Sequence, residues 1–312
     1  MATTHLLEPH RGTLHGHFAR DLAPVVTIDP GDTVRFRTLA SGWHLDDGPV
    51  DDVAAVPLFP GRLSPQDDGH ALVGPVAIRG ARPGMTLEVG IGAMVPGHVG
   101  RCFAGGRPTP LNERLGLAGD SVMHAWALDP AAGTACNQHG HTVALAPFMG
   151  VLGCAPDEPG VLSTVPPRAC GGNIDCRELV AGSTLFLPIA VEGALFSTGD
   201  GHGAQGDGEV GGTAIECAME RVDLTFALRD DLPLTTPLAR TPAGWVAMGF
   251  HADLDEAAAI ALEAMLAFIG PRLGLGRADA LALCSVAVDL RVTQIVNEVK
   301  GVHALLAPDA VR

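Results

Sequence analysis

The sequence carries one short unit three times, in which a glycine turn leads into a run with strand character. The copies are residues 30–36 (PGDTVRF), 83–89 (PGMTLEV) and 181–187 (AGSTLFL). In the first copy Val34 and Phe36 alternate with Arg35 and Arg37, which is the period of a strand with one buried face. Glycine permits the tight turn, and the residues after it favour a pleated surface. Each copy therefore predicts a turn that feeds a strand.

Two of these copies follow other apolar runs, at residues 25–28 and 76–79. Paired with the strand after the turn, each run would form a hairpin of a β-sandwich or barrel. Residues 97–170 are rich in Gly, Pro, His and Cys and show little periodicity, so long loops and short strands are expected there. Strand-like alternation returns at residues 214–227.

The C-terminal part changes to a helical pattern. Asp253 and Glu256 have the spacing of a capping box, which predicts a helix from Asp253 to Ile269 that ends at Gly270-Pro271. A second helix is expected at 278–287, and strands at 288–296 and 302–306. The fold class is therefore mainly β, a sandwich or barrel body with a small C-terminal α/β subdomain. The expected division is 1–227 for the β-rich catalytic body with its metal-site loops and 228–312 for the C-terminal part packed on it.

Composition narrows the classes of function. The 312 residues include 40 Gly and 24 Pro, which disfavours a helical bundle, and the net charge of −15 disfavours binding to nucleic acid. No run approaches the length needed to span a membrane, and the N-terminus carries no apolar leader, so no membrane partner and a cytoplasmic location are expected. The seven cysteines form no Cys-x-x-Cys pair, which fits free thiols in a reducing compartment.

The densest polar segment is residues 197–209, which follows an apolar run. Asp200 and His202 would share one face of an extended chain, and a carboxylate with an imidazole suits Zn²⁺ or a similar divalent metal. The spacing does not match an EF-hand loop, although a Ca²⁺-type structural loop and a plain solvated loop are alternatives. Upstream, Asp175 in GGNID (171–175) could supply a third oxygen ligand, while Gly-Gly-Asn-x-Asp alone often forms only a turn.

Two His-x-His pairs offer further candidate ligands. His15 and His17 precede an apparent strand and could reach a metal site, whereas His139 and His141 lie in a loop-like run. The alternative for both pairs is a set of surface or hydrogen-bonded histidines. Cys170 and the following cysteine at 176 flank the GGNID segment, where buried structural thiols are the simpler interpretation.

Absent motifs exclude several mechanisms. Lys300 is the only lysine and has no serine or cysteine motif beside it, which disfavours both Ser-Ser-Lys and Cys-Glu-Lys amidases. The sequence has no Gly-x-Ser-x-Gly elbow, no phosphate-binding Walker loop and no dinucleotide fingerprint.

The chain resembles the acetamidase/formamidase family over most of its length. The matching pieces include residues 70–76 (HALVGPV), 146–150 (APFMG), 165–168 (VPPR), 171–175 (GGNID), 199–209 (GDGHGAQGDGE) and 212–216 (GTAIE). The resemblance implies hydrolysis of formamide, acetamide or similar short amides to the carboxylate and ammonia, a mainly β architecture, a homo-oligomer and an associated divalent metal, often zinc. The Gly- and Arg-rich segment 94–117 does not follow the family pattern, which leaves the range of substrates open.

The roles that follow are hypotheses about named residues. Asp175, Asp200 and His202 would hold the metal, expected to be Zn²⁺ with Ca²⁺ as the alternative, and further ligands could come from His15 and Glu216. Glu209 or Asp207 would act as general base and then as acid. Asn173 or Gln205 would donate to the developing oxyanion. Two other functions stay open: a metallohydrolase of another substituted or cyclic amide or ester, and a non-catalytic β-sandwich binding protein with a structural ion.

Overall fold

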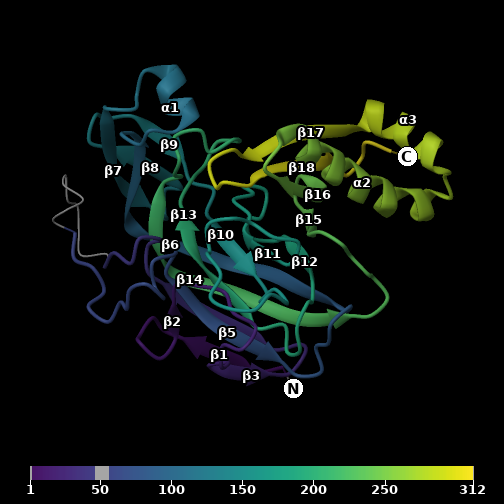
Figure 1. The fold of residues 1–312 in the computed structure, drawn as a ribbon, viewed down its shortest axis with the longest axis horizontal. Coiled ribbons are helices and arrows are strands. Elements are labelled where there is room, and N and C mark those ends of the chain that lie inside the picture. The colour runs from purple at the N-terminus through teal and green to yellow at the C-terminus, as the bar shows by residue number, and fades with distance from the viewer. Residues whose placement is uncertain (1, 46–55, 312) are drawn as a thin grey trace.

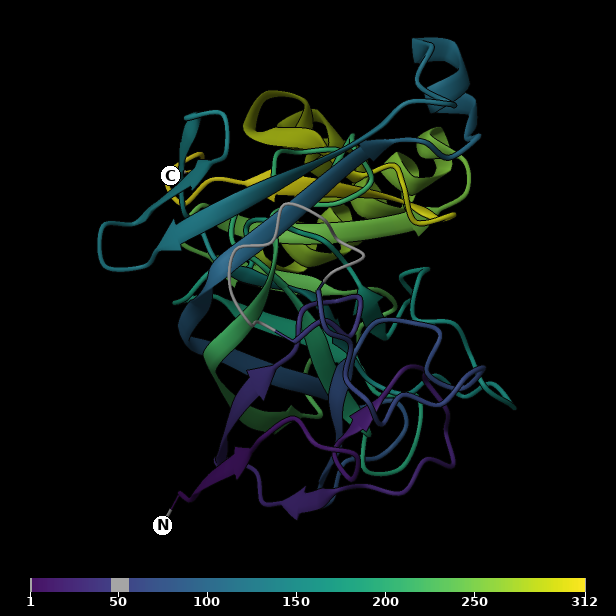
Figure 2. The ribbon, with the colours of Figure 1, turned by 90° about the vertical axis from the view of Figure 1, so that its left-hand side faces the viewer.

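The computed structural model describes residues 2–45 and 56–311. Strands make up 42% and helices 12% of it, so the mainly β class with a C-terminal α/β part is confirmed. The N-terminal third contributes β1 (Thr4–Leu7), β2 (Leu14–His15), β3 (Val26–Ile28), β4 (Thr33–Thr38) and β5 (Leu72–Ile78). An arm that projects from the body is built from β6 (Thr86–Gly105), α1 (Pro110–Leu115), β7 (Ser121–Asp129), β8 (Thr134–Asn137) and β9 (Thr142–Ala144), as Figures 1 and 2 show.

The central strands carry the polar segments singled out in the sequence. They are β10 (Phe148–Gly153), β11 (Gly171–Asn173), β12 (Thr184–Pro188), β13 (Phe196–His202) and β14 (Glu216–Arg229). The C-terminal part consists of β15 (Leu238–Thr241), β16 (Gly244–His251), α2 (Leu254–Leu273), α3 (Arg277–Ala287), β17 (Val288–Gln294) and β18 (Lys300–Leu306). Among the named strands, the pairings are antiparallel except for β1 with β4 and β3 with β5.

The three repeated units are turns followed by strands, as predicted. Their glycines, Gly31, Gly84 and Gly182, have φ values of 98°, 88° and 90°. Each turn is closed by a backbone hydrogen bond between its first and fourth residues, of 3.0, 3.1 and 3.1 Å. A positive φ at the third position is the mark of a type II turn, which only glycine adopts without strain. The strands β4, β6 and β12 begin directly after these turns.

The predicted hairpins around these turns are wrong. β3 pairs with β5, while β4 pairs with β1 and β14. β5 pairs with β13, and β6 pairs with β7, β12 and β14. The first turn is itself bonded to β14, since the Gly31 amide donates to the Phe226 carbonyl and the Phe226 amide donates to the Asp32 carbonyl. Because these backbone groups of the turn are bonded to β14, they are not available to a hairpin between β3 and β4.

The expectation of long loops in residues 97–170 is also wrong in its first part. β6 is a single strand of 20 residues that continues through Gly105 into the arm. Its register against β14 shifts on both sides of the pair formed by Pro96 and Met219. The next pair on one side joins Val95 to Arg221. Such bulges bend a strand and interrupt the alternation of buried and exposed side chains. The strand therefore left no period-two signal in the sequence.

The C-terminal helices begin where predicted. The Asp253 side chain accepts hydrogen bonds from the amides of Asp255 (2.9 Å) and Glu256 (3.2 Å), as an N-cap does. The end predicted at Gly270-Pro271 is wrong, because α2 runs on to Leu273. Near a C-terminus a proline removes only one intrahelical bond, and the chain leaves the helix at the left-handed Gly274.

The two largest hydrophobic clusters of the described residues lie in the body and in the C-terminal part. The body core includes the edge-to-face pair Phe196 and Phe226, whose ring centroids are 5.1 Å apart. The second core lies between α2 and the strands β16 and β18, and Phe186 of β12 joins it. Because β12 pairs with both β6 and β15, the C-terminal strands extend the sheet of the body. The division at residue 227 stays a prediction.

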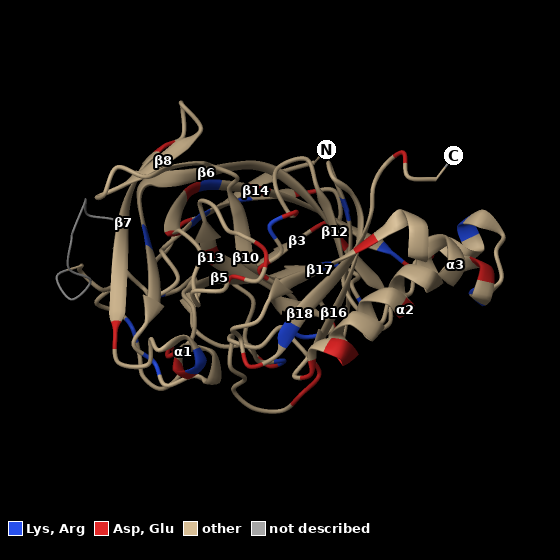
Figure 3. Ribbon diagram, turned by 90° about the horizontal axis from the view of Figure 1, so that it is seen from above, with Lys and Arg blue, Asp and Glu red and all other residues tan. Residues whose placement is uncertain are grey.

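Charged residues occur along the chain in both the body and the C-terminal helices, as the coloured ribbon of Figure 3 shows. In the described part of the chain, no single helix has the length and apolar character to cross a membrane. Among the described residues, only α2 and α3 counted together reach that length and apolar character, and the two helices are bent by 109° relative to each other.

Candidate metal centre

Four buried side chains, each with an oxygen or nitrogen atom that can bind a metal, converge at one end of β13. His202 Nε2 lies 3.4 Å from Asp200 Oδ1, 3.4 Å from Glu216 Oε1 and 4.0 Å from Asp175 Oδ1. Asp200 and His202 share one face of β13, and the antiparallel register places Glu216 of β14 directly opposite His202. Asp175 follows β11 by two residues. Residues separated by up to 41 positions therefore meet because of strand pairing.

Glu209 extends this cluster on the side of Glu216. Ligand atoms of His202, Glu209 and Glu216 lie within 4.8 Å of one another, and so do those of Asp175, Asp200 and His202. We call the five residues the acidic cluster: Asp175, Asp200, His202, Glu209 and Glu216. Each contributes a buried atom with no hydrogen-bond partner among the described residues. Buried polar atoms are nearly always paired, so a group of unpaired acceptors with no donor suits a cation.

The His202 ring is oriented so that Nε2 is free to bind a metal. Gln205 Nε2 donates to the Asp175 carbonyl (2.8 Å), which fixes the direction of the Gln205 amide. Gln205 Oε1 is then an acceptor for the hydrogen on His202 Nδ1, at 3.0 Å. A neutral histidine with hydrogen on Nδ1 presents the Nε2 lone pair, and a second hydrogen bond of this kind is usual for metal-binding histidines.

Gly150 of β10 provides the space in which the carboxylates meet. A Cβ atom at this position would lie 2.6 Å from Asp175 Oδ1, 2.6 Å from Asp200 Oδ2 and 2.9 Å from the His202 ring. No side chain fits at that distance. The Gly150 carbonyl also accepts from the amide of Asp175 (3.2 Å), which ties the two segments together.

Backbone strain is concentrated in the acidic cluster. Asp175, Asp200 and Glu209 have φ values of 52°, 60° and 46°, in the left-handed region that residues other than glycine rarely adopt. Each such residue costs about 1 kcal/mol or more. Strain of this kind persists only where the surrounding structure enforces it, and it is common at functional sites.

The cluster holds more negative charge than its single imidazole can neutralise. Burial raises the pKa of Asp175 to about 8, and burial together with the Asp200 charge raises that of Glu216 to about 7. Burial and the Asp175 charge raise the pKa of Glu209 well above its usual range. Burial opposes the ionised form of Asp200 too, but the charges of His202 and His70 and the hydrogen bonds of Asp200 with His202 and Glu216 together outweigh it, so the pKa of Asp200 is lowered. Without a cation, the cluster must therefore retain protons at neutral pH.

His15, a possible additional ligand in the sequence, lies outside the acidic cluster. Its Nε2 is 3.0 Å from Ser197 Oγ and its Nδ1 is 2.7 Å from the His17 carbonyl, so both ring nitrogens are engaged. Burial lowers its pKa to about 4, which keeps the ring neutral. This correction favours the alternative interpretation, a hydrogen-bonded core histidine.

Asp207 also lies apart from the acidic cluster. Its Oδ2 accepts a hydrogen bond from Arg291 Nε (2.7 Å), and Arg291 Nη1 donates to Glu178 Oε1 (2.6 Å). A carboxylate held by a guanidinium is a poor base, so Glu209 is the better candidate of the two. Asn173 donates its amide to the Val165 carbonyl (3.1 Å). The oxyanion roles of Asn173 and Gln205 stay predictions.

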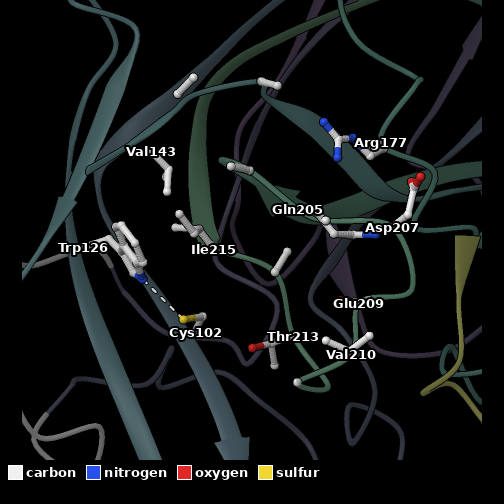
Figure 4. Close-up of a pocket in the computed structure, with 16 residues that line it drawn as sticks. Cys102, Trp126, Val143, Arg177, Gln205, Asp207, Glu209, Val210, Thr213 and Ile215 are labelled. Atoms are coloured by element: carbon white, nitrogen blue, oxygen red, sulfur yellow. Dashed lines mark hydrogen bonds between the residues drawn. The ribbon is translucent and has the colours of Figure 1, made fainter. Parts of the chain in front are cut away.

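A pocket of about 410 Å³ opens beside the cluster, and Glu209 belongs to both. Figure 4 shows Arg177, Gln205 and Asp207 on one side and Trp126 and Val143 on the other. Most of its lining comes from the arm and from the loop that joins β13 to β14, and Arg177 comes from the segment between β11 and β12. The acidic cluster is thus reached from an open pocket with one polar and one apolar side.

Asn297 is a site residue that the sequence did not reveal. Its Nδ2 donates to Asp175 Oδ2 at 2.5 Å, across 122 positions of the chain. The turn between β17 and β18 carries it, and Gln294 Oε1 shapes that turn by accepting from the amides of Val296 (2.9 Å) and Asn297 (3.1 Å). The Gly208 amide also donates to the Thr293 carbonyl (3.1 Å). The C-terminal part therefore helps to build the site, although no local motif around Asn297 signals it.

Comparison with known proteins agrees with this fold. Residues 159–311 match the model of the acetamidase/formamidase family. The structure of an acetamidase from Bacillus halodurans superposes with a TM-score of 0.85 at 27% identity, covering 97% of each chain. An acetamidase from Yersinia enterocolitica gives a TM-score of 0.86 at 26% identity, covering 100% of this chain and 94% of the other. A Schizosaccharomyces pombe protein described as a formamidase is 27% identical over 288 residues, which is 72% of this chain and 67% of that protein.

The fold and these relatives define the class of protein as a hydrolase of the amidase type. Residues 159–311 match the acetamidase/formamidase family, and the resemblance to that family noted in the sequence is confirmed.

The substitution Gly150→Ala tests the geometry of the cluster. Its Cβ would push the Asp175 and Asp200 carboxylates apart, so we expect affinity for Zn²⁺ to fall at least about tenfold. Titration calorimetry on chelator-treated protein measures this, with circular dichroism to confirm folding. Gly119→Ala is the matched control, since nothing lies within 4 Å of a Cβ there. Unchanged Zn²⁺ affinity in Gly150→Ala would show that the carboxylates do not share one ion.

The stability of the metal-free protein should fall as the pH rises from about 6.5 to about 8, above the range in which the lowered pKa values of His15 and His303 have the opposite effect. A carboxyl whose pKa is raised by folding stabilises the native state below its ordinary value near 4 and loses that contribution as the pH rises through the folded value, about 7 for Glu216 and about 8 for Asp175. The lowered pKa of Asp200 acts only below about pH 4. Calorimetry in chelator should show the melting temperature falling over this window, with a smaller fall in Asp175→Asn. A rise in melting temperature would contradict the raised pKa values.

Proposed function

We propose that this chain hydrolyses short aliphatic amides, of the formamide and acetamide type, to the carboxylate and ammonia with the help of a divalent metal. The observation that carries the proposal is the acidic cluster, in which buried acceptors converge without a hydrogen-bond donor among the described residues. The names of the relatives, acetamidase and formamidase, support the choice of substrate. The family assignment supports the coarser statement, amide hydrolysis.

The residues that would hold the metal are Asp175, Asp200 and His202, with Glu216 as a fourth. Three carboxylates and one neutral imidazole form a donor set typical of Zn²⁺, while the imidazole disfavours the alternative, Ca²⁺. When bound, such a cation supplies Lewis acidity toward a carbonyl oxygen and makes water more acidic. Gln205 and Asn297 would hold the ligands in place, since they contact His202 and Asp175.

Glu209 is our candidate for the proton transfers. Its Oε2 has no partner within the described residues, and the side chain borders both the cluster and the pocket. It would take a proton from the attacking water and deliver it to the amide nitrogen, so that the carbon–nitrogen bond breaks and ammonia leaves. Because burial raises its pKa, the protonated form needed for the second step persists at neutral pH.

The proposal also covers the compartment of the protein, its partner molecules and its assembly. None of the seven cysteines forms a disulfide in the described part of the chain, which supports a reducing compartment such as the cytoplasm. The net charge of −15 supports a small-molecule partner and gives no reason to expect nucleic acid or a membrane. Assembly as a homo-oligomer also remains part of the proposal, on the strength of the family resemblance.

Ammonia release from formamide, acetamide and propionamide, measured before and after chelation, tests the proposed function. We expect chelation to abolish release and Zn²⁺ to restore it, and we expect Asp200→Ala to lose release by about 10³-fold or more, because a ligand is missing. Release that survives complete chelation would refute the dependence on metal. Absence of release from every amide by Zn²⁺-loaded protein would refute the proposed activity.

The substitution Glu209→Gln separates proton transfer from metal binding. We expect Zn²⁺ content to remain at the level of the unmodified protein while kcat falls about 10²-fold or more, because the amide cannot accept the proton. Metal content is measured by atomic emission and kcat by ammonia release. Glu192→Gln, at an exposed position, is the matched control. Loss of metal together with rate would place Glu209 among the ligands instead.

A further inference from the structure

We propose that the pocket beside Glu209 selects primary amides with an apolar acyl group about the size of a phenyl ring, larger than those of formamide and acetamide. The inference rests on the proposed function, because it describes the substrate of the same site. It extends that function to a class of acyl group that the names of the relatives do not indicate. Three features of the pocket carry it: its volume, its apolar side and the placement of its polar groups.

The volume exceeds what a short amide can fill. At about 30 Å³ for each water-sized group, the 410 Å³ of the pocket has room for about a dozen non-hydrogen atoms. Acetamide has about four, so it would leave most of the space to water. A pocket of this size falls in the range in which proteins bind ligands with a ring or a branched chain.

The apolar side of the pocket is a fixed surface. Trp126 belongs to β7, pairs with Gly100 of β6, and donates its indole N–H to Cys102 Sγ at 3.3 Å. Only 8% of Trp126 and 5% of Ile215 is exposed, so neighbouring residues hold both in place. An indole whose N–H is already engaged presents only apolar ring surface to a ligand.

The mouth of the pocket adds apolar surface that no described residue covers. Val143 on β9 is 38% exposed and Val210, next to Glu209, is 66% exposed. The small side chains of Ala144 and Ala214 also line the pocket. Covering such surface with an apolar acyl group is favourable at about 25 cal/mol per Å².

The polar groups determine which end of the amide enters first. Glu209, whose Oε2 has no partner among the described residues, offers an acceptor on the side opposite Trp126, and Asp207 lies on that side with its Oδ2 held by Arg291, as Figure 4 shows for the pocket as a whole. A primary amide nitrogen carries two N–H donors, one of which Glu209 would accept. A substituent on the nitrogen would remove one donor and point into the polar side. The apolar group therefore belongs on the carbonyl carbon, from which it reaches toward Trp126.

Steady-state kinetics of the Zn²⁺-loaded enzyme test this assignment. The substrates are acetamide, hexanamide, phenylacetamide and N-benzylacetamide, and kcat/KM is the quantity compared. We expect kcat/KM for phenylacetamide to exceed that for acetamide at least about tenfold, since even one buried methylene is worth about that factor in a fitted pocket. N-benzylacetamide should not exceed acetamide. Phenylacetate should also inhibit at a concentration at least about tenfold lower than acetate does.

A substitution at the mouth of the pocket tests the same inference by changing the protein instead of the substrate. Ala144→Phe fills the pocket from an exposed position and should lower the phenylacetamide-to-acetamide ratio of kcat/KM about tenfold or more. Ala132→Phe makes the same change at an exposed turn of the arm outside the pocket lining and should leave the ratio unchanged. Equal effects of the two substitutions would overturn the assignment of this pocket.

The outcomes separate the inference from the proposed function. Turnover of acetamide with no gain for phenylacetamide or hexanamide overturns the larger acyl group and leaves the amidase activity standing. A preference for N-benzylacetamide overturns the orientation on which the inference depends. Failure to release ammonia from any primary amide refutes the proposed function itself.

Discussion

The structure depends on the burial of four carboxylates around one imidazole. Removing a charged group from water costs several kcal/mol after relaxation, and the cost grows when like charges meet. Asp175, Asp200, Glu209 and Glu216 surround His202, and each has an oxygen without a donor among the described residues. Hydrophobic burial in the rest of the body must offset this cost. A bound divalent cation would attract all four carboxylates and so offset the repulsion between them. The same cluster therefore destabilises the metal-free fold and provides the basis of the proposed chemistry.

Gathering these groups requires segments that are distant in the sequence. The His202–Glu216 contact follows from the register of β13 against β14, and the position of Asp175 from the approach of β10 to β11 at Gly150. The left-handed backbone at three cluster residues is the local cost of aiming the carboxylates inward. The Asn297 contact brings the C-terminal part to the same point. A mainly β fold suits this arrangement, because strand pairing holds distant residues in a fixed register.

What could be predicted from the sequence is what depends on neighbours along the chain. The three glycine turns and the N-cap at Asp253 are local features, and each was predicted correctly. Asp200 and His202 were paired correctly because two residues of one strand share a face. Strand partners, the long bent strand β6 and the contact of Asn297 depend on distant segments, so local periodicity could not reveal them. The end of α2 was misplaced because the cost of a proline depends on its distance from the helix end.

Asp207 and Glu209 show how far residue type and spacing can determine a role. They stand two positions apart in one glycine-rich string, and the sequence alone assigns them the same acid–base chemistry. In the structure Arg291, 84 positions away from Asp207, neutralises one of them, whereas no donor reaches Oε2 of the other among the described residues. Arg291 occupies Oδ2 of Asp207, while Glu209 keeps an oxygen with no partner among the described residues, and burial raises the pKa of Glu209. The difference in function therefore lies in the partner that the fold supplies to each carboxylate, and not in the carboxylates themselves.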